Sequence, residues 1–215
     1  MIRHALAPVV PGAARALGVP RTLPGAEGVA ITFDDGPHPQ GTPAILEVLA
    51  RAGARAMFFM IGEQVRRRPE LAVEVTARGH AVALHGDRHR LQLRLRPAEL
   101  REDLRRGAAA LEDATGNAPV WHRPPYGIYS AAGLAEARSQ DLRPLLWSRW
   151  GKDWRRFTTP RRIAGRVGAA GLGDVILLHD ADFYSSRGSH ERTEQALALI
   201  LKELKNRQIG TVLPV

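Results

Sequence analysis

The sequence alternates between strand-like and helix-like segments along most of its length. This βα repeat predicts a parallel sheet, because each crossover helix returns the chain to the same end of the sheet before the next strand begins. Seven such units fit either an open doubly wound sheet or a closed barrel. The predicted strands are 28–34, 55–61, 80–85, 118–123, 142–148, 174–179 and 209–213. The predicted helices are 42–52, 63–78, 97–115, 130–138, 160–170 and 191–207.

Local signals and chain length favour one α/β domain. Pro97 stands near the start of a predicted helix, where proline is tolerated, and Gly53, Gly79 and Gly116 follow helices as C-terminal caps often do. At 215 residues the chain is long enough for a single domain with a sizeable core. We expect a short N-terminal segment over 1–27, followed by the domain.

Composition restricts which side chains could bind a metal and which partners we expect the chain to bind. Cysteine is absent, so disulfides and thiolate metal sites are excluded, and His, Asp and Glu are the candidate metal ligands. The net charge of +9 is carried almost entirely by arginine. These arginines are scattered, and 66–68 is the only run of three, which favours a solvated basic surface over a specific nucleic-acid site. A nucleic-acid binder remains an alternative that predicts strong, salt-dependent affinity.

Nothing in the sequence predicts a membrane-spanning helix or a signal peptide. No apolar run approaches the roughly 20 residues that a span needs. Pro8, Pro11 and Arg15 interrupt the apolar stretch near the N-terminus. Both a cytoplasmic protein and an exported one whose leader is missing from this sequence fit these features.

Polar residues stand where the predicted strands end. Because the carboxyl ends of parallel strands meet at one face of a barrel, where such folds hold their active sites, we expect these side chains to gather there. They are Asp34 and Asp35 after the first strand, His85 after the third, Arg123 after the fourth, Asp153 and Trp154 after the fifth and His179 after the sixth.

A metal site is one interpretation of this arrangement. His85 and His89 are four residues apart, so both imidazoles share a face if the chain is helical after His85. Two imidazoles and one carboxylate make a three-ligand catalytic site with an open position for water. The HxxxH pattern alone fits two surface histidines better, and the nearby carboxylate favours the metal.

Structural interpretations compete with several of these roles. Asp-Gly-Pro at 35–37 is ordinary turn chemistry, and His179 fits a core histidine bonded to Asp180 or to backbone. We expect Trp121, Trp147 and Trp150 to serve packing rather than ligand contacts. No role is assigned to four other histidines: His38, His80, His122 and His190.

Five ordered motifs together resemble the polysaccharide deacetylases, a metal-dependent family that includes chitin, chitooligosaccharide and peptidoglycan deacetylases. The resemblance implies a distorted βα barrel with about seven strands. It also implies hydrolysis of an N-acetyl amide on a glycan or small amino sugar, with release of acetate. The motifs are TFDDGP at 32–37, HGDRH at 85–89, RPPYG at 123–127, KDW at 152–154 and LLHD at 177–180.

The resemblance also implies a role for each polar residue of the metal centre. Asp34 would be the general base. Asp35, His85 and His89 would hold a divalent metal, most often zinc, which would offset the cost of two adjacent carboxylates. Arg123 would pair with Asp34 and keep it ionised.

The remaining matched positions would handle the substrate. The backbone N–H of Tyr126 would donate to the oxyanion, and His179 would be the general acid. Trp154 and Leu177 would enclose the acyl methyl group. Asp153 would belong to the charge network that tunes the arginine or His179.

The sequence departs from the family pattern at two positions. Gly86 replaces the usual Ser or Thr of the second motif, and Trp150 replaces the first aspartate of the fourth. The second change leaves Asp153, and less directly Asp180, to tune His179. We expect Tyr129 and a Ser- and Gly-rich rim over 181–190 to shape substrate choice.

Two other functions fit the same motifs. Relatives of this family act on formamido sugars or on ureido compounds with similar ligands, so a deformylase or a ureido hydrolase is the nearer alternative. A non-catalytic carbohydrate-binding protein is the other, and the presence of every presumed catalytic residue argues against it.

Overall fold

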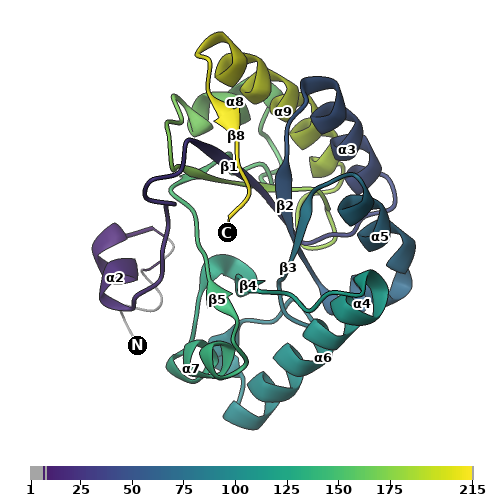
Figure 1. Cartoon of the computed structure of the whole chain (residues 1–215), viewed down its shortest axis with the longest axis vertical. Coiled ribbons are helices and arrows are strands. Elements are labelled where there is room, and N and C mark those ends of the chain that lie inside the picture. The colour runs from purple at the N-terminus through teal and green to yellow at the C-terminus, as the bar shows by residue number, and fades with distance from the viewer. Residues whose placement is uncertain (1–6, 8, 215) are drawn as a thin grey trace.

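A computed structural model describes residues 7 and 9–214. Seven parallel strands follow the spatial order β5-β4-β3-β2-β1-β7-β6, and β8 pairs with β1 beside this path. The sheet curls into an incomplete barrel with helices outside it (Figure 1), which confirms the expected distorted βα barrel. The strands are Gly28–Asp34 (β1), Ala56–Met60 (β2), Ala81–Leu84 (β3), Trp121–His122 (β4), Arg143–Pro144 (β5), Arg149–Trp150 (β6), Val175–His179 (β7) and Gly210–Thr211 (β8).

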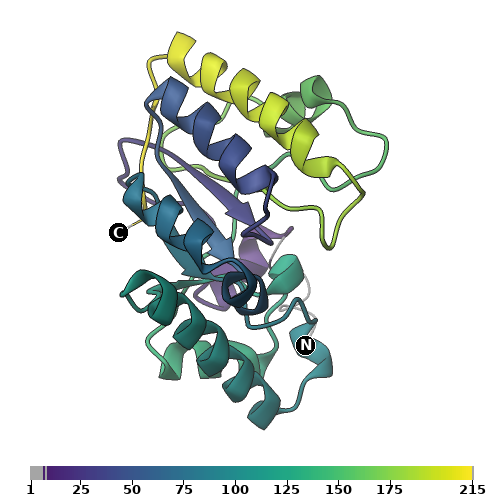
Figure 2. The same cartoon turned by 90° about the vertical axis from the view of Figure 1, so that its right-hand side faces the viewer.

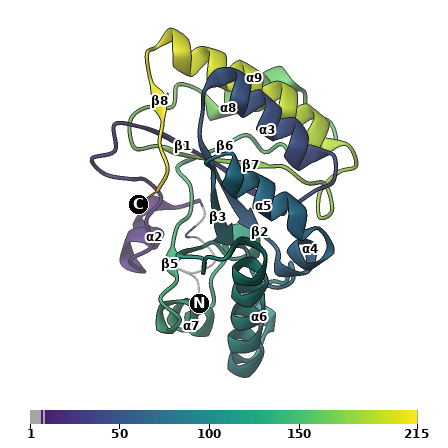
Figure 3. The ribbon, with the colours of Figure 1, turned by 45° about the vertical axis from the view of Figure 1, so that its right-hand side comes forward.

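The helices form an outer layer. Figure 2 shows α9, α3, α5 and α6 side by side along one face of the molecule, and Figure 3 shows α6 and α7 at the end opposite α8 and α9. Among the described residues, no helix combines the length and apolar character needed to cross a bilayer. The α-helices are Pro11–Ala16 (α2), Gly41–Ala52 (α3), Gly62–Arg67 (α4), Pro69–Ala77 (α5), Pro97–Thr115 (α6), Ala131–Ser139 (α7), Pro160–Val167 (α8) and Ser189–Asn206 (α9), with 3-10 turns at Gln92–Arg94 and Pro125–Gly127.

The central strand β1 determines the height along the strands at which the site residues lie. Every residue of β1 is buried, because β2 and β7 pair with it on either side and helices cover its outer face. The parallel register sets Asp34 beside Phe59 of β2 and His179 of β7. Two of the predicted catalytic groups therefore come from neighbouring strands at the same height.

The segment before β1 packs along the seam between β5 and β6. Pro20 accepts a hydrogen bond from the backbone N–H of Leu146 at 2.9 Å, and Thr22 forms an antiparallel bridge with Asp174. Val19 belongs to the buried apolar core. The described part of residues 1–27 therefore covers the open side of the barrel.

Two predicted elements are wrong in extent. The helix expected over 63–78 is two helices, because Arg68 leaves the helical region (φ −148°) before Pro69 starts α5. The strand expected over 142–148 is interrupted between β5 and β6. There the carbonyls of Leu145 and Leu146 accept hydrogen bonds from the buried Arg123 side chain instead of from a neighbouring strand.

Two other strands are shorter than expected. The segments 118–123 and 209–213 each contribute only a two-residue strand, β4 and β8. The helix expected over 160–170 ends at Val167, where Gly168 takes a φ of +64°.

Candidate active site

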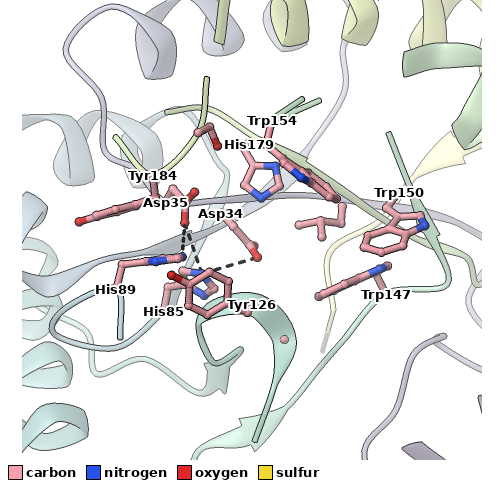
Figure 4. Close-up of a pocket in the computed structure, with 13 residues that line it drawn as sticks. Asp34, Asp35, His85, His89, Tyr126, Trp147, Trp150, Trp154, His179 and Tyr184 are labelled. Atoms are coloured by element: carbon pink, nitrogen blue, oxygen red, sulfur yellow. Dashed lines mark ion pairs between the residues drawn. The ribbon is translucent and has the colours of Figure 1, made fainter. Parts of the chain in front are cut away.

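The predicted polar residues gather in one pocket of about 220 Å³ at the carboxyl ends of the strands. Figure 4 shows the carboxylates and imidazoles on one side of it and three tryptophans on the other. The pocket is lined by Asp34, Asp35, His85, His89, Tyr126, Gly127, Trp147, Trp150, Trp154, Leu177, His179, Tyr184 and Ser185.

Asp35, His85 and His89 form a compact donor set. Oδ1 of Asp35 lies 3.5 Å from Nε2 of His85 and 3.3 Å from Nε2 of His89. This buried oxygen has no hydrogen-bond partner among the described residues. Nδ1 of His85 lies 2.7 Å from the carbonyl oxygen of Arg123, which only accepts, so the proton of a neutral ring sits on Nδ1. The lone pair on Nε2 then faces the Asp35 oxygen, an arrangement that fits a shared cation.

The electrostatics of these groups favour metal ligation at neutral pH. Burial lowers the pKa of His89 to about 4, against the opposing effect of Asp35, so its imidazole is neutral. Burial alone raises the pKa of Asp35, but the histidine-rich surroundings, with the cationic His179 among them, outweigh burial and lower the pKa to about 2. An ionised carboxylate and neutral imidazoles are the forms that bind zinc.

The loop that carries the two histidines is not helical, so the condition under which their spacing alone would place both imidazoles on one face is not met. Gly86 has a φ of +92°, which side chains rarely adopt, and a Cβ there would lie 3.0 Å from Oδ2 of Asp103. The same oxygen accepts the backbone N–H of Asp87 at 3.0 Å, and the other Asp103 oxygen pairs with Arg90 at 2.6 Å. A carboxylate from α6 therefore holds this loop, where the sequence suggested only the loss of a hydroxyl.

Asp34 lies beside this donor set and has its own cationic partner. Its Oδ1 accepts a hydrogen bond from Nη1 of Arg123 at 2.7 Å, and its Oδ2 lies 3.8 Å from Nε2 of His85. The Arg123 side chain is fully buried and also donates to Thr32. Its guanidinium stacks over the ring of Phe59, 4.0 Å from the centroid. A rigid buried arginine thus orients the Asp34 carboxylate.

His179 faces the carboxylates from β7. Its Nδ1 lies 2.9 Å from Oδ1 of Asp153, and its backbone N–H donates to Oδ2 of Asp153 at 2.7 Å. Burial lowers the pKa of His179, but Asp153, with help from Asp35 and Asp34, outweighs it and raises the pKa to about 10. This imidazole is a cation at neutral pH, with Nε2 left as its second N–H donor.

Of the two acids considered for tuning His179, only Asp153 bonds its ring. The Asp180 side chain instead accepts a hydrogen bond from Thr42 and lies against Gly36, where any Cβ would clash with it. Burial raises the pKa of Asp180 to about 7. Its contacts support the turn after Asp35 rather than the imidazole.

The apolar part of the pocket lies beyond His179. The Trp154 ring meets the His179 ring edge-on at 5.4 Å, and Leu177 lines the same wall. Tyr126 borders the mouth with a φ of +62°, and its ring meets His89 edge-on at 4.6 Å. A left-handed backbone at a bulky residue is rare and is typical of functional sites.

The aromatic residues match the expectations only in part. Trp147 and Trp150, expected to serve packing rather than ligand contacts, pack on each other at 5.6 Å and also line the pocket. Tyr129, expected to shape substrate choice, is fully buried and donates its hydroxyl to the His122 carbonyl at 2.9 Å. Tyr184 lines the pocket and was not singled out, although it lies in the rim segment 181–190. Only that segment's position after His179 pointed to it.

The comparisons with known proteins agree with this geometry. The family model described as polysaccharide deacetylase matches residues 23–145, more than half of the chain. The chain belongs to the polysaccharide deacetylase family. Its two departures from the family's pattern, at Gly86 and Trp150, both lie at or beside the pocket.

Characterised polysaccharide deacetylases resemble the chain over most of its length. A chitooligosaccharide deacetylase from Bradyrhizobium sp. is 34% identical over 190 residues, covering 85% of this chain and 87% of the relative. A peptidoglycan-N-acetylglucosamine deacetylase from Bacillus cereus is 36% identical over 182 residues, covering 83% and 82%. The solved family 4 carbohydrate esterase from Streptomyces lividans, in complex with acetate, superposes with a TM-score of 0.78 at 28% identity and covers 87% of this chain and 93% of that one.

Proposed function

We propose that this polysaccharide deacetylase hydrolyses the N-acetyl amide of an amino sugar in a glycan and releases acetate. One observation carries the proposal: the unpartnered Asp35 oxygen faces two imidazoles, beside an Asp34 held by Arg123. The names of the relatives from Bradyrhizobium and Bacillus cereus support chitooligosaccharides and peptidoglycan as the substrate class.

Asp35, His85 and His89 would hold the divalent cation, and one carboxylate with two imidazoles suits zinc. When bound, the cation would supply Lewis-acid activation of the acetyl carbonyl and would lower the pKa of water. Cysteine is absent from the chain, so thiolate ligation plays no part.

Asp34 would act as the general base. Arg123 orients its carboxylate through a contact of 2.7 Å that engages Oδ1 alone, which leaves Oδ2 to accept a proton from the attacking water. The water oxygen then bonds to the carbonyl carbon, and the N–H of Tyr126 would donate to the oxygen on which negative charge develops.

His179 would act as the general acid. Its raised pKa supplies the imidazolium, and the Asp153 contact on Nδ1 directs the Nε2 proton to the amine nitrogen as the C–N bond breaks. The products are acetate and the free amino sugar. Trp154 and Leu177 would enclose the acetyl methyl group, which favours a small acyl chain.

The test is product release from a small substrate panel. The purified protein is incubated with chitooligosaccharides, peptidoglycan and N-formyl amino sugars, before and after chelation and zinc add-back. Acetate release that chelation abolishes and zinc restores supports the proposal. Formate release without acetate release would support the deformylase alternative, and metal binding without hydrolysis of any substrate would support a carbohydrate-binding protein.

A further inference from the structure

The two imidazoles of the proposed metal site are oriented by different means. His85 has a hydrogen bond from Nδ1 to a backbone carbonyl, the usual outer contact of a metal-binding histidine. Among the described residues, His89 has no such hydrogen bond, and its ring instead lies between two tyrosines. Tyr184 stacks on it with centroids 4.2 Å apart and planes 10° apart, while Tyr126 meets it edge-on. Figure 4 shows the Tyr184 and His89 rings lying face to face.

Tyr184 is itself fixed at its far end. Its hydroxyl donates to Oε1 of Glu63 at 3.0 Å and accepts from Nε2 of Gln64 at 3.3 Å. Both partners belong to α4, the helix that follows β2 in the chain. Although 37% of the residue is exposed, the ring therefore has a defined position above His89.

The loop that carries Tyr184 is anchored by Asp182. This carboxylate accepts the backbone N–H of Gly188 at 2.7 Å and lies 3.3 Å from Nε2 of His38. Nδ1 of His38 accepts the backbone N–H of Gly41 at 2.9 Å, so the proton of the neutral ring sits on Nε2 and points to Asp182.

The tautomer of His38 decides whether a second group of donor residues forms a metal site or only anchors the loop. Ligand atoms of His38, Asp182 and His190 lie within 4.8 Å of one another, as a metal site requires. The Nε2 of His38 carries a proton, however, and is not free to bind a cation. This group thus fastens the loop to the segment after β1 and does not fit a second metal site.

From these contacts we propose that Tyr184 is a positioning residue that holds the ring of His89 in the plane needed for metal binding. The inference rests on the proposed role of His89 as a ligand. A flat stack restricts rotation of the imidazole about its Cβ–Cγ bond, which is the freedom that an outer hydrogen bond restricts for His85. The loop anchor then matters because it keeps Tyr184 over His89.

The test measures zinc affinity by competition with a chromophoric chelator. Tyr184→Leu removes the aromatic face, and we expect affinity to fall about tenfold, the lower end of the loss seen for outer contacts of metal ligands. Tyr184→Phe keeps the face but loses the hydroxyl contacts with Glu63 and Gln64, so its zinc affinity should lie between those of the wild type and Tyr184→Leu. Arg187→Ala is the matched control, because Arg187 lies in the same loop and is exposed. It should leave affinity unchanged.

A spectroscopic readout separates ligand geometry from general loosening. The visible spectrum of the cobalt-substituted protein should change most for Tyr184→Leu, less for Tyr184→Phe and not for Arg187→Ala. Equal zinc affinity for the wild type and Tyr184→Leu, or equal losses for the Leu and Phe variants, would overturn the role of the stacked ring. A wild type that binds no zinc would overturn the proposed function itself, and Tyr184's role with it.

Discussion

Nδ1 of His179 lies 2.9 Å from Oδ1 of Asp153, a carboxylate with no exposed side-chain surface. The other Asp153 oxygen accepts two further hydrogen bonds, from the His179 backbone N–H and from the Thr193 hydroxyl at 2.8 Å. All three donors converge on one buried acid, so its orientation is fixed. This pair determines whether His179 carries the proton that the proposed reaction needs.

Replacement of that acid should shift the pH dependence of turnover. In Asp153→Asn, the two donors on Oδ2 require the amide oxygen there, so the amide NH₂ faces Nδ1 of His179 and disfavours the imidazolium. The raised pKa of about 10 then falls, and the alkaline limb of the kcat profile moves to lower pH. We expect kcat at neutral pH to drop about 10²–10⁴-fold. The measurement is acetate release from pH 5 to 10.

Asp180→Asn is the matched control for that experiment. Asp180 adjoins His179 in sequence but bonds Thr42, and its raised pKa of about 7 means that a neutral side chain is already partly populated. The alkaline limb of the kcat profile of Asp180→Asn should stay near that of the wild type. Equal shifts of the alkaline limb in the two variants would show that Asp153 does not specifically raise the pKa of His179.

The two adjacent aspartates should respond differently to mutation. Asp34→Asn removes the base but leaves the Asp35 donor set intact, so turnover should be lost while bound zinc stays near one per chain. His85→Ala and His89→Ala should lose the metal. Elemental analysis after dialysis distinguishes the cases. Zinc content in Asp34→Asn as low as in His85→Ala would contradict the division of roles.

Arg123 should matter for stability as well as for activity. Arg123→Met leaves Asp34 buried without its cation and removes the donors of the Leu145 and Leu146 carbonyls. Breaking a buried ion pair of this kind costs about 3–5 kcal/mol, which urea unfolding of the metal-free protein would show. Adding Asp34→Asn should recover part of the loss, because the second change removes the unpaired charge. A single Met variant as stable as the wild type would refute the coupling.

The carboxylate of Asp103 should tune metal affinity from outside the pocket. Asp103→Ala removes the acceptor of the Asp87 N–H and the partner of Arg90, so the loop between His85 and His89 loosens. We expect about tenfold weaker zinc binding, as for other supports of metal ligands. Glu99→Ala, on the same helix and ion-paired with Arg96 alone among the residues that the structure describes, is the control. Identical zinc affinities for both variants would rule out this support.

The order of the five motifs was enough to predict most of the proposed function, because each motif is a local pattern of residues. Two carboxylates at a strand end, two histidines four residues apart and a histidine after an apolar run are all short-range patterns. The βα alternation then implies that they share one edge of a parallel sheet. The chain after His85 is not helical, because a positive φ at Gly86 and the Asp103 carboxylate across from it determine the path of that loop.

By itself, the sequence determined the parallel α/β class, the single domain-sized core and the kinds of groups at the strand ends, because periodicity and residue chemistry are local properties. The choice of a barrel over an open sheet came from the resemblance of the five motifs to a known family. Tertiary structure alone decided which atoms meet. Tyr184 stacks on His89 at the rim of the pocket, Trp147 and Trp150 line it, and Arg123 donates to the carbonyls that would have continued a strand. Each of these contacts depends on strand register and loop paths that bring together residues distant in sequence, and no local pattern records them.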